Sequence, residues 1–364
     1  MLLTAVRAAT VAVVMLLHIG VGIGGHAEGE RAQEFRVASH DFVVNEFKFQ
    51  SGETLPEVRI HYRTIGTPAR DAAGRISNAM LVLHGSSGDS TQVLANSFTD
   101  PLIHAGQPLD ARQHYLIFPD NLGNGHSTKP SDGLRARFPR YGYTDMVALQ
   151  HRLITEHLGI ARLRLVIGIS MGGMQAWMWG VKYPQAMDAI VPIAAMPTAI
   201  TGRNLLWRSI LTQAIRNDPE WKNGDYTKQP AGFLAIMPMF DMLVQSPARL
   251  QESIVSRDRA RAHLKDVLDE TLEEDDANNI LYRFESSFDY NVEPVLERIE
   301  ARVLAILFAD DELNPPELGT MERVMPRVKN GRLVLIPAGP QTEGHRTQVK
   351  AAVWREHLRE FLKN

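Results

Sequence analysis

The sequence predicts an α/β protein in which a mostly parallel sheet is covered by helices on both faces. Short, nearly continuous apolar runs, such as those at 79–83, 165–167 and 303–308, fit strands that are buried on both faces. Amphipathic helical patterns lie between several of these runs, and such alternation implies parallel strands joined by helical crossovers. With 364 residues, of which 44% are hydrophobic, the chain can build one large core or a core with a subdomain.

The first residues have the layout of a secretory leader. Arg7 supplies the only early positive charge, residues 8–23 are largely apolar, and small residues end at Ala27. The apolar run is short for a membrane span and contains His18. We therefore interpret residues 1–27 as the signal peptide of an exported protein, periplasmic or secreted, with no further membrane span. The alternatives are an uncleaved anchor and a misassigned start codon before a cytoplasmic enzyme.

The first elements after the leader form an edge of the predicted sheet. Alternating stretches at Phe42–Phe49 and Val58–Thr64 flank a polar turn and predict an antiparallel hairpin. Amphipathic helices are expected at Tyr143–Leu158, with Thr144 as N-cap, and at Ala351–Leu362. The apolar runs that predict buried strands are Ala79–Leu83, Tyr115–Phe118, Leu165–Ile167, Ala189–Ile193, Val303–Phe308 and Leu333–Ile336.

The alternation of strands and helices breaks between about Ala199 and Arg298. This stretch is rich in Leu, Met, Trp and charged residues and has no convincing strand run, which predicts a helical insert between two strands. We therefore divide the chain into a leader at 1–27, a core formed by 28–198 and 299–364, and a helical lid at 199–298.

Composition excludes several classes of function. The net charge is −3 and no long block of like charge occurs, so we expect no nucleic-acid partner. The chain has no cysteine, which excludes a cysteine nucleophile, disulfides and thiolate metal sites. We expect neither a metal nor an organic cofactor.

The stretch "RLVIGISMGGMQAW" places Ser170 where a predicted strand ends and a predicted helix begins. A turn that projects a serine hydroxyl above a sheet crowds the backbone, so its neighbours must be small, as Gly168, Gly172 and Gly173 are. The following helix aims free N–H groups at the same point, where an oxyanion would form. The alternative is a glycine-rich connection whose serine only caps the helix. The strand–turn–helix context favours Ser170 as a nucleophile.

A nucleophilic serine needs a base, and the base needs an orienting acid, in the chain order Ser, then Asp or Glu, then His. The stretch "VLAILFADDELNPPE" places Asp310, Asp311 and Glu312 after a late strand, and spacing does not choose between Asp310 and Asp311. His345 follows the last strand in "VLIPAGPQTEGHRTQV" and is the expected base. The competing histidines lie in helical patterns or in earlier loops: His84, His126, His151, His157, His263 and His357.

Two backbone N–H groups are needed to stabilise a tetrahedral intermediate. One is expected from Met171, directly after the nucleophile, and the other from the loop "HGSSG" after an early strand, where Ser86 is the candidate. An ordinary glycine–serine turn is the alternative for that loop. The motif "DNLGNGHS", residues 120–127, is interpreted as a structural turn closed by Asp or Asn side chains.

These residues resemble the homoserine O-acetyltransferase family, a branch of the α/β-hydrolase superfamily. The resemblance covers "SGETLPEVRIHYRTIGTP", "LVLHGSSGDS", "DNLGNGHSTKPS", "HRLITEHLGIARLRLVIGISMGG", "NDPEWKNGDY", "ADDELNPPE" and "GHRT", and so nearly the whole mature chain. It implies an α/β-hydrolase fold and a Ser–Asp–His triad that is acylated and passes its acyl group to an alcohol. In the family pattern the acid lies two residues before a Leu, which on this chain is Leu313, so the resemblance selects Asp311.

Two positions depart from the family pattern. The family resemblance implies an arginine for the substrate carboxylate where this chain has Thr212, and an aspartate after the catalytic histidine where this chain has Arg346. A charge-assisted contact contributes about 1.5–3 kcal/mol, so losing both weakens homoserine binding by orders of magnitude. Arg203 and Arg208 lie nearby in the sequence as possible replacements.

Three functional hypotheses follow. The first is a serine hydrolase of small-molecule esters or related acyl compounds, favoured by the complete triad, the missing homoserine anchors and the leader, because acetyl-CoA is a cytosolic donor. The second is an O-acyltransferase that moves an acyl group from acyl-CoA to an alcohol. The third is a non-catalytic binding protein, which the complete triad disfavours. By resemblance, a homodimer through the lid is also expected.

Overall fold

The computed structural model describes residues 35–363, and the predicted leader at 1–27 lies outside the described residues. Within residues 35–363 an eight-stranded sheet has the order β1-β2-β4-β3-β5-β6-β7-β8. The last six strands of this order are mutually parallel, whereas β2 pairs antiparallel with both β1 and β4. The mostly parallel sheet predicted from the sequence is therefore confirmed. The strands are β1 (Ala38–Lys48), β2 (Thr54–Ile65), β3 (Ala79–Leu83), β4 (Tyr115–Pro119), β5 (Leu165–Ile169), β6 (Ala189–Ile193), β7 (Arg302–Phe308) and β8 (Gly331–Ile336).

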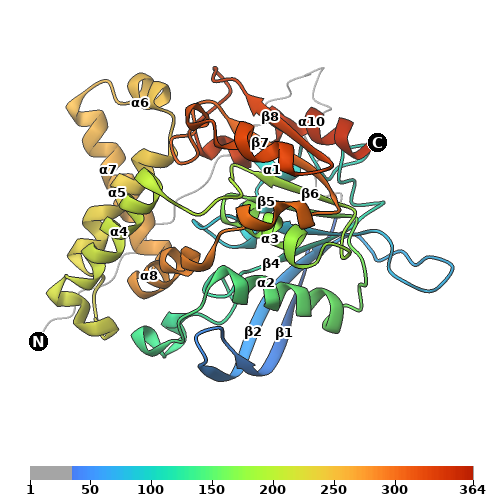
Figure 1. Cartoon of the computed structure of the whole chain (residues 1–364). Helices are drawn as coiled ribbons and strands as arrows, with labels where there is room; N and C mark the ends of the chain where they lie inside the picture. The colour runs from blue at the N-terminus through green and yellow to red at the C-terminus, as the bar shows by residue number, and fades with distance from the viewer. Residues whose placement is uncertain (1–34, 364) are drawn as a thin grey trace, which may run out of the picture. The chain divides into compact units, whose positions relative to one another are not determined.

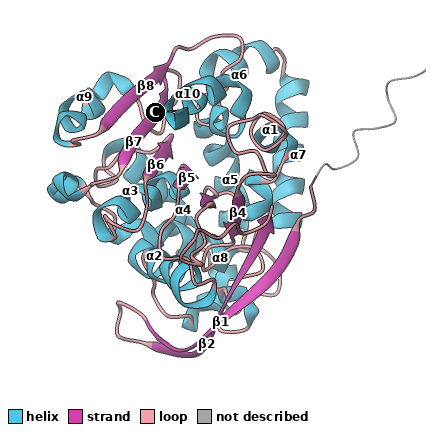
Figure 2. Ribbon diagram, turned by 90° about the vertical axis from the view of Figure 1, so that its right-hand side faces the viewer, coloured by secondary structure: helices cyan, strands magenta, loops and turns pink. Residues whose placement is uncertain are grey.

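The predicted hairpin at the sheet edge is confirmed and is longer than expected. Strands β1 and β2 pair from Ala38 with Thr64 to Lys48 with Thr54, and the turn between them uses Gly52 at a φ of 91°. Figure 2 shows this hairpin at one edge of the sheet and β8 at the other. An antiparallel pair at an edge leaves the parallel strands in the middle, where they are covered on both faces.

Apolar side chains from both faces of the sheet form two separate core clusters. In β3, for example, Leu81 joins one cluster and its neighbour Val82 joins the other, and both are fully buried. Successive strand residues point to opposite faces, so strands covered on both sides read as continuous apolar runs. One cluster includes residues of α2 (Tyr143–Arg152, followed by a π turn at Leu153–His157), α3 (Met171–Lys182) and α9 (Thr320–Val324), and the other includes residues of α1 (Asn96–Thr99) and α10 (Ala351–Lys363).

Helix α2 begins at Tyr143 as expected, but the prediction that Thr144 caps it is wrong. The carboxylate of Asp289 accepts hydrogen bonds from the backbone N–H groups of Tyr143 and Thr144, at 2.9 and 3.0 Å. Asp145 in addition accepts from the N–H of Gly142 at 2.9 Å. The first N–H groups of a helix need acceptors, and here a residue 145 positions away along the chain supplies them.

Between β6 and β7, residues 194–301 form helices and turns without a strand. These helices share a core cluster of their own, built around Trp207, Phe233, Leu281 and Phe284, to which Leu313 of the main fold contributes. Figure 1 shows the helices gathered beside one end of the sheet. They are α4 (Gly202–Arg216), α5 (Ala231–Val244), α6 (Pro247–Ser253), α7 (Arg257–Glu274) and α8 (Ala277–Glu285).

Within residues 35–363 no single helix is long and apolar enough to span a bilayer. Helices α5 and α6 are long and apolar enough only when taken together, and the chain bends by 110° between them.

Candidate active site

Ser170 lies in a sharp turn between β5 and α3. Its φ of 49° and ψ of −114° lie outside the regions that residues with a side chain ordinarily occupy. The turn also requires glycine nearby: a Cβ on Gly168 would lie 2.2 Å from the carbonyl oxygen of Gly172, and one on Gly172 would lie 2.4 Å from that of Leu83. The local sequence therefore forces the serine hydroxyl out of the strand and above the sheet.

The structure brings Ser170, Asp311 and His345 together from three distant parts of the chain. The Oγ atom of Ser170 lies 2.8 Å from Nε2 of His345, and Nδ1 of His345 lies 2.8 Å from Oδ2 of Asp311. All three side chains are buried. Because a carboxylate accepts at Nδ1, that nitrogen carries the hydrogen, and Nε2 is left to accept the serine hydroxyl proton.

The turn after β7 holds Asp311 as a carboxylate. Its Oδ1 accepts from the backbone N–H groups of Leu313 and Asn314 at 2.9 and 3.2 Å, and its Oδ2 accepts from Asn314 Nδ2 at 3.1 Å. Burial raises the pKa of Asp311, but the charge of His345 and these hydrogen bonds outweigh it and hold the pKa below the ordinary value. Asp311 is therefore ionised at neutral pH and orients the imidazole.

Asp310, which spacing left open as the acid, faces elsewhere. Its Oδ2 accepts from Thr342 Oγ1 at 2.9 Å and from the N–H of Gly344 at 3.0 Å, which supports the loop that leads to His345. Glu312 is at the surface, where its carboxylate pairs with Arg203 at 3.4 Å.

The loop after β3 is held so that backbone N–H groups remain free beside Ser170. The neutral ring of His84 donates from Nδ1 to the carbonyl of Gly85 at 2.7 Å, and burial lowers the pKa of His84. Gln92 accepts from the N–H of Gly85 at 2.7 Å. Among residues 35–363 no hydrogen-bond acceptor engages the N–H of Ser86 or of Met171. Both N–H groups are thus available to an oxyanion.

The motif at residues 120–127 is a turn closed by an Asp side chain, as its structural interpretation predicted, and it also contacts this loop. Asp120 accepts from the N–H of His126 at 2.9 Å, and Asn121 donates from its N–H to Nε2 of His84 at 3.0 Å. Sequence reasoning did not single out Asn121, Gln92 or Asn314, because the contacts through which they support the site depend on how the chain folds.

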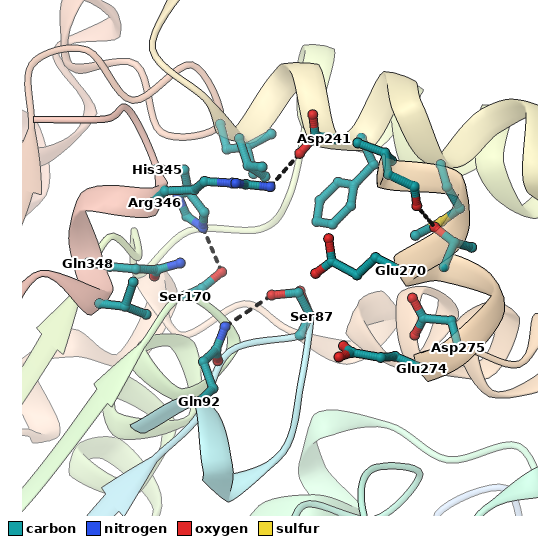
Figure 3. Close-up of a pocket in the computed structure, with 18 of the residues that line it drawn as sticks. Ser87, Gln92, Ser170, Asp241, Glu270, Glu274, Asp275, His345, Arg346 and Gln348 are labelled. Carbon is teal, nitrogen blue, oxygen red and sulfur yellow. Dashed lines mark hydrogen bonds and ion pairs between the residues drawn. The ribbon is translucent and has the colours of Figure 1, made fainter. Parts of the chain in front are cut away.

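A cavity of about 440 Å³ lies between Ser170 and the helical insert. Figure 3 shows His345 and Ser170 on one side and the acidic residues Glu270 and Glu274 on the other. The main fold contributes mostly small and polar residues to the lining, and the insert contributes aromatic, aliphatic and charged ones. The principal lining residues are Ser86, Ser87, Gln92, Ser170, Leu313, His345 and Arg346 from the main fold, and Trp207, Arg208, Met237, Phe240, Asp241, Val244, Glu270, Glu274 and Asp275 from the insert.

Of the two departures from the family pattern, Arg346 lines this cavity, and Thr212 is not among its lining residues. Arg346 donates to Asp241 of α5 (Figure 3). The other carboxylate oxygen of Asp241 lies 2.8 Å from Nε2 of His263 of α7. Thr212 is buried and donates to the carbonyl of Ser209 at 3.2 Å. Arg346 is therefore charge-compensated by the insert itself.

Arg208 lies one helical turn before Thr212 and lines the cavity. Its side chain is buried, its Nε donates to Asn204 at 2.9 Å, and its guanidinium lies 5.1 Å from the centre of the Phe284 ring. Burial lowers its pKa, and within residues 35–363 no carboxylate lies within ion-pair distance of it. Of the two arginines proposed as replacements, only Arg208 reaches the cavity.

Comparisons with known proteins agree with this geometry. Residues 78–235 match the family described as the alpha/beta hydrolase fold. A probable acyltransferase of Methanothermobacter thermautotrophicus is 31% identical over 298 residues, which cover 79% of this chain and 88% of that protein. A homoserine O-acetyltransferase of Trichormus variabilis is 30% identical over 298 residues, covering 74% of this chain and 79% of that protein. The crystal structure of an acetylester hydrolase from Corynebacterium glutamicum covers 90% of this chain and 96% of its own, with a TM-score of 0.78 and 21% identity, and so shares the fold.

Proposed function

This chain belongs to the homoserine O-acetyltransferase-like family of the α/β-hydrolase fold, and we propose that it hydrolyses small carboxylic esters through an acyl-enzyme on Ser170. The observation that carries the proposal is the continuous hydrogen-bonded chain from Ser170 through His345 to Asp311, with 2.8 Å at each link. It opens onto a cavity large enough for a small acyl substrate.

The first half of the reaction forms the acyl-enzyme. His345 Nε2 takes the proton of the Ser170 hydroxyl as Oγ bonds to the ester carbonyl carbon, and the carbonyl oxygen becomes an oxyanion. The N–H groups of Met171 and Ser86 donate to that oxygen, and the N-terminus of α3 adds a partial positive charge. The tetrahedral intermediate then breaks its bond to the alkoxide, which receives the proton from His345 and leaves as the alcohol.

The second half regenerates the serine. A water molecule gives a proton to His345 Nε2 and bonds to the acyl carbon, and collapse of the second tetrahedral intermediate breaks the bond to Ser170 Oγ. His345 returns its proton to the serine, and the acyl group leaves as a carboxylic acid. Throughout, Asp311 stabilises the imidazolium without taking a proton.

Hydrolysis is favoured over transfer to homoserine by the two changed positions. Thr212 offers no positive charge to an amino-acid carboxylate, and the Arg346 side chain is bound to Asp241. An ammonium group near Arg346 meets a guanidinium in place of a carboxylate, which is repulsive.

A second candidate function, transfer of an acyl group to an alcohol that carries a carboxylate, is supported by one observation. Arg208 is a buried cation without a carboxylate partner in residues 35–363, and it lines the same cavity as Ser170. An uncompensated buried charge is costly, and an anionic substrate group would relieve that cost.

A panel of acyl donors distinguishes the two functions. Short p-nitrophenyl esters and acetyl-CoA are incubated with the protein, each with and without homoserine or another carboxylated alcohol, and free acid and acylated alcohol are quantified. Hydrolysis predicts free acid from the esters at a rate that the alcohols do not change. Release of CoA that requires the alcohol, with an acylated alcohol as product, would replace hydrolysis by transfer.

We further propose that residues 199–298 act as a lid over the acyl site and that two copies of the chain pair through this region. The lid assignment is supported by the aromatic and aliphatic side chains that α4 and α5 place over the cavity. Exposed apolar residues on the same helices, including Leu206 and Ile210, support pairing. Sedimentation equilibrium tests pairing, with a dimer expected for the wild type and a monomer for Leu206→Glu.

We also propose that residues 1–27 direct export, on the strength of their basic, apolar and small-residue layout. N-terminal sequencing of the protein recovered from its native cells tests this. A mature chain that begins near residue 28, in the periplasmic or external fraction, is expected. A full-length chain in the cytoplasm would contradict it.

A further inference from the structure

A buried arginine of the helical insert holds the backbone of the loop that supplies Ser86. Arg283 lies in α8, and its Nη1 donates to the carbonyl oxygen of Ser86 at 2.9 Å, across 197 positions of the sequence. The residue is only 6% exposed. A charged donor to a buried carbonyl makes a stronger hydrogen bond than a neutral one.

Several peptide groups of this loop are held by different contacts. His84 holds the carbonyl of Gly85, Gln92 holds the N–H of Gly85, and Asn124 Nδ2 donates to the carbonyl of Gly88 at 2.7 Å. The carbonyl of Ser86 is held by Arg283 alone among residues 35–363.

The peptide between Ser86 and Ser87 is planar and trans, so its carbonyl and its N–H point in opposite directions. Arg283 draws the carbonyl towards the insert and thereby fixes the plane of this peptide and the direction of the Ser87 N–H. The same contact holds the carbonyl end of Ser86, whose own N–H is free beside Ser170. Figure 3 shows Ser87 and Gln92 of this region next to Ser170.

Attachment of α8 to the main fold does not depend on Arg283. Asn279 accepts from the N–H of Ser131 and donates to its hydroxyl, both at 2.9 Å, and Tyr282 donates to the carbonyl of Phe138 at 2.7 Å. The charge of Arg283 is partly compensated by Asp275, 3.7 Å away, and its Nε has no hydrogen-bond partner among residues 35–363. Within residues 35–363 the only hydrogen bond that the Arg283 side chain donates is therefore the one to Ser86.

We propose that Arg283 is a positioning residue for the oxyanion-binding loop and that it makes catalysis by Ser170 depend on the helical insert. This inference rests on the proposed acyl-serine chemistry. Arg283 does not touch the reacting atoms; it holds the peptide that directly follows Ser86 and so restrains the position of the residue whose N–H faces the oxyanion. Preorganised donors are effective because they need no reorientation as negative charge develops.

The test compares Arg283→Gln with Arg283→Lys and with a matched control, Arg216→Gln. Arg216 also attaches to α8, through a two-nitrogen ion pair with Glu285, but it lies at the surface and away from the cavity. Initial rates on a short p-nitrophenyl ester give kcat and KM, and hydrogen–deuterium exchange is followed in the peptide that covers residues 84–88.

For Arg283→Gln we expect kcat to fall by about 10- to 100-fold with KM changed by less than about threefold, a smaller loss than removal of a whole oxyanion donor. Exchange in residues 84–88 is expected to rise. Arg283→Lys restores part of kcat, and Arg216→Gln leaves both readouts at the wild-type level. Should Arg283→Gln fail to fold, Arg283→Met combined with Asp275→Asn removes both charges of the pair and takes its place.

The proposal is overturned if the Arg283 variants keep wild-type kcat and wild-type exchange at residues 84–88, or if Arg216→Gln produces the same losses. A wild-type protein without ester turnover would refute the proposed function instead. The exchange measurement then still decides whether Arg283 orders the loop.

Discussion

Replacing Asp311 by asparagine is expected to reverse the hydrogen-bonding polarity of the triad. Oδ1 of Asp311 accepts from two backbone N–H groups, those of Leu313 and Asn314. The amide oxygen of an asparagine takes that position, because the amide nitrogen cannot accept. The NH₂ group then faces Nδ1 of His345, which must become an acceptor, and the imidazole hydrogen moves to Nε2. In that tautomer His345 cannot accept the proton of Ser170.

The expected loss in kcat for Asp311→Asn is about 10³- to 10⁴-fold, the size observed when a triad histidine is held in the wrong tautomer. This corresponds to about 4–5.5 kcal/mol of transition-state stabilisation. In the wild type, Nδ2 of Asn314 donates to Oδ2 of Asp311 at 3.1 Å. In the variant the new NH₂ group takes the place of Oδ2, so two donors face each other and the contact is unfavourable. Initial rates on p-nitrophenyl acetate measure the loss, with circular dichroism to verify folding.

Asp310→Asn is the matched control, since the two carboxylates are adjacent and spacing alone did not separate them. Asp310 accepts from Thr342 and Gly344, and an amide oxygen can do the same, so kcat is expected to stay within about threefold of wild type. Equal losses in the two variants, or an Asp311→Asn enzyme within tenfold of wild type, would refute the assignment of the acid.

Three further predictions concern packing, pH and specificity. Gly172→Ala places a Cβ 2.4 Å from the carbonyl oxygen of Leu83 and is expected to lower the free energy of unfolding by about 1–3 kcal/mol in urea titrations. Gly339→Ala is the control: a Cβ there has no atom within 4 Å, so the free energy of unfolding is expected to stay the same. Burial lowers the pKa of His84 in the folded state, so below the ordinary value of 6.5 the unfolded chain binds more protons than the folded one. The free energy of unfolding therefore falls as pH falls through that range. In urea titrations at about pH 7.5 and about pH 5, His84→Asn is expected to show a smaller difference in this free energy than the wild type. Arg208→Gln is expected to raise KM for esters that carry a carboxylate by about 10- to 100-fold, as loss of a charge-assisted contact implies, and to leave KM for uncharged esters unchanged.

The fold and the choice of Ser170 and His345 as site residues follow from local patterns in the sequence. Apolar runs without alternation identify strands covered on both faces, and the glycines around Ser170 identify a turn that tolerates no Cβ. His345 was selected by its position after the last strand. The leader at 1–27 lies outside the described residues and stays a prediction.

Local patterns in the sequence could not predict contacts between distant segments. Spacing did not separate Asp310 from Asp311, because the choice depends on how the turn after β7 directs each side chain, and only the family resemblance selected Asp311. The prediction that Thr144 caps α2 was wrong because Asp289, far along the chain, accepts hydrogen bonds from the first N–H groups of the helix. The Arg283 contact to Ser86 has no local signal at all.

The most direct test of the account is to trap the acyl group. Wild-type protein is mixed with p-nitrophenyl acetate, quenched in acid within the burst, digested and mapped by tandem mass spectrometry. One acetyl group on Ser170, which disappears as turnover is completed and never forms in Ser170→Ala, is the expected result. Acetylation of another residue, or a Ser170→Ala protein that still turns over the ester at the wild-type rate, would contradict the account.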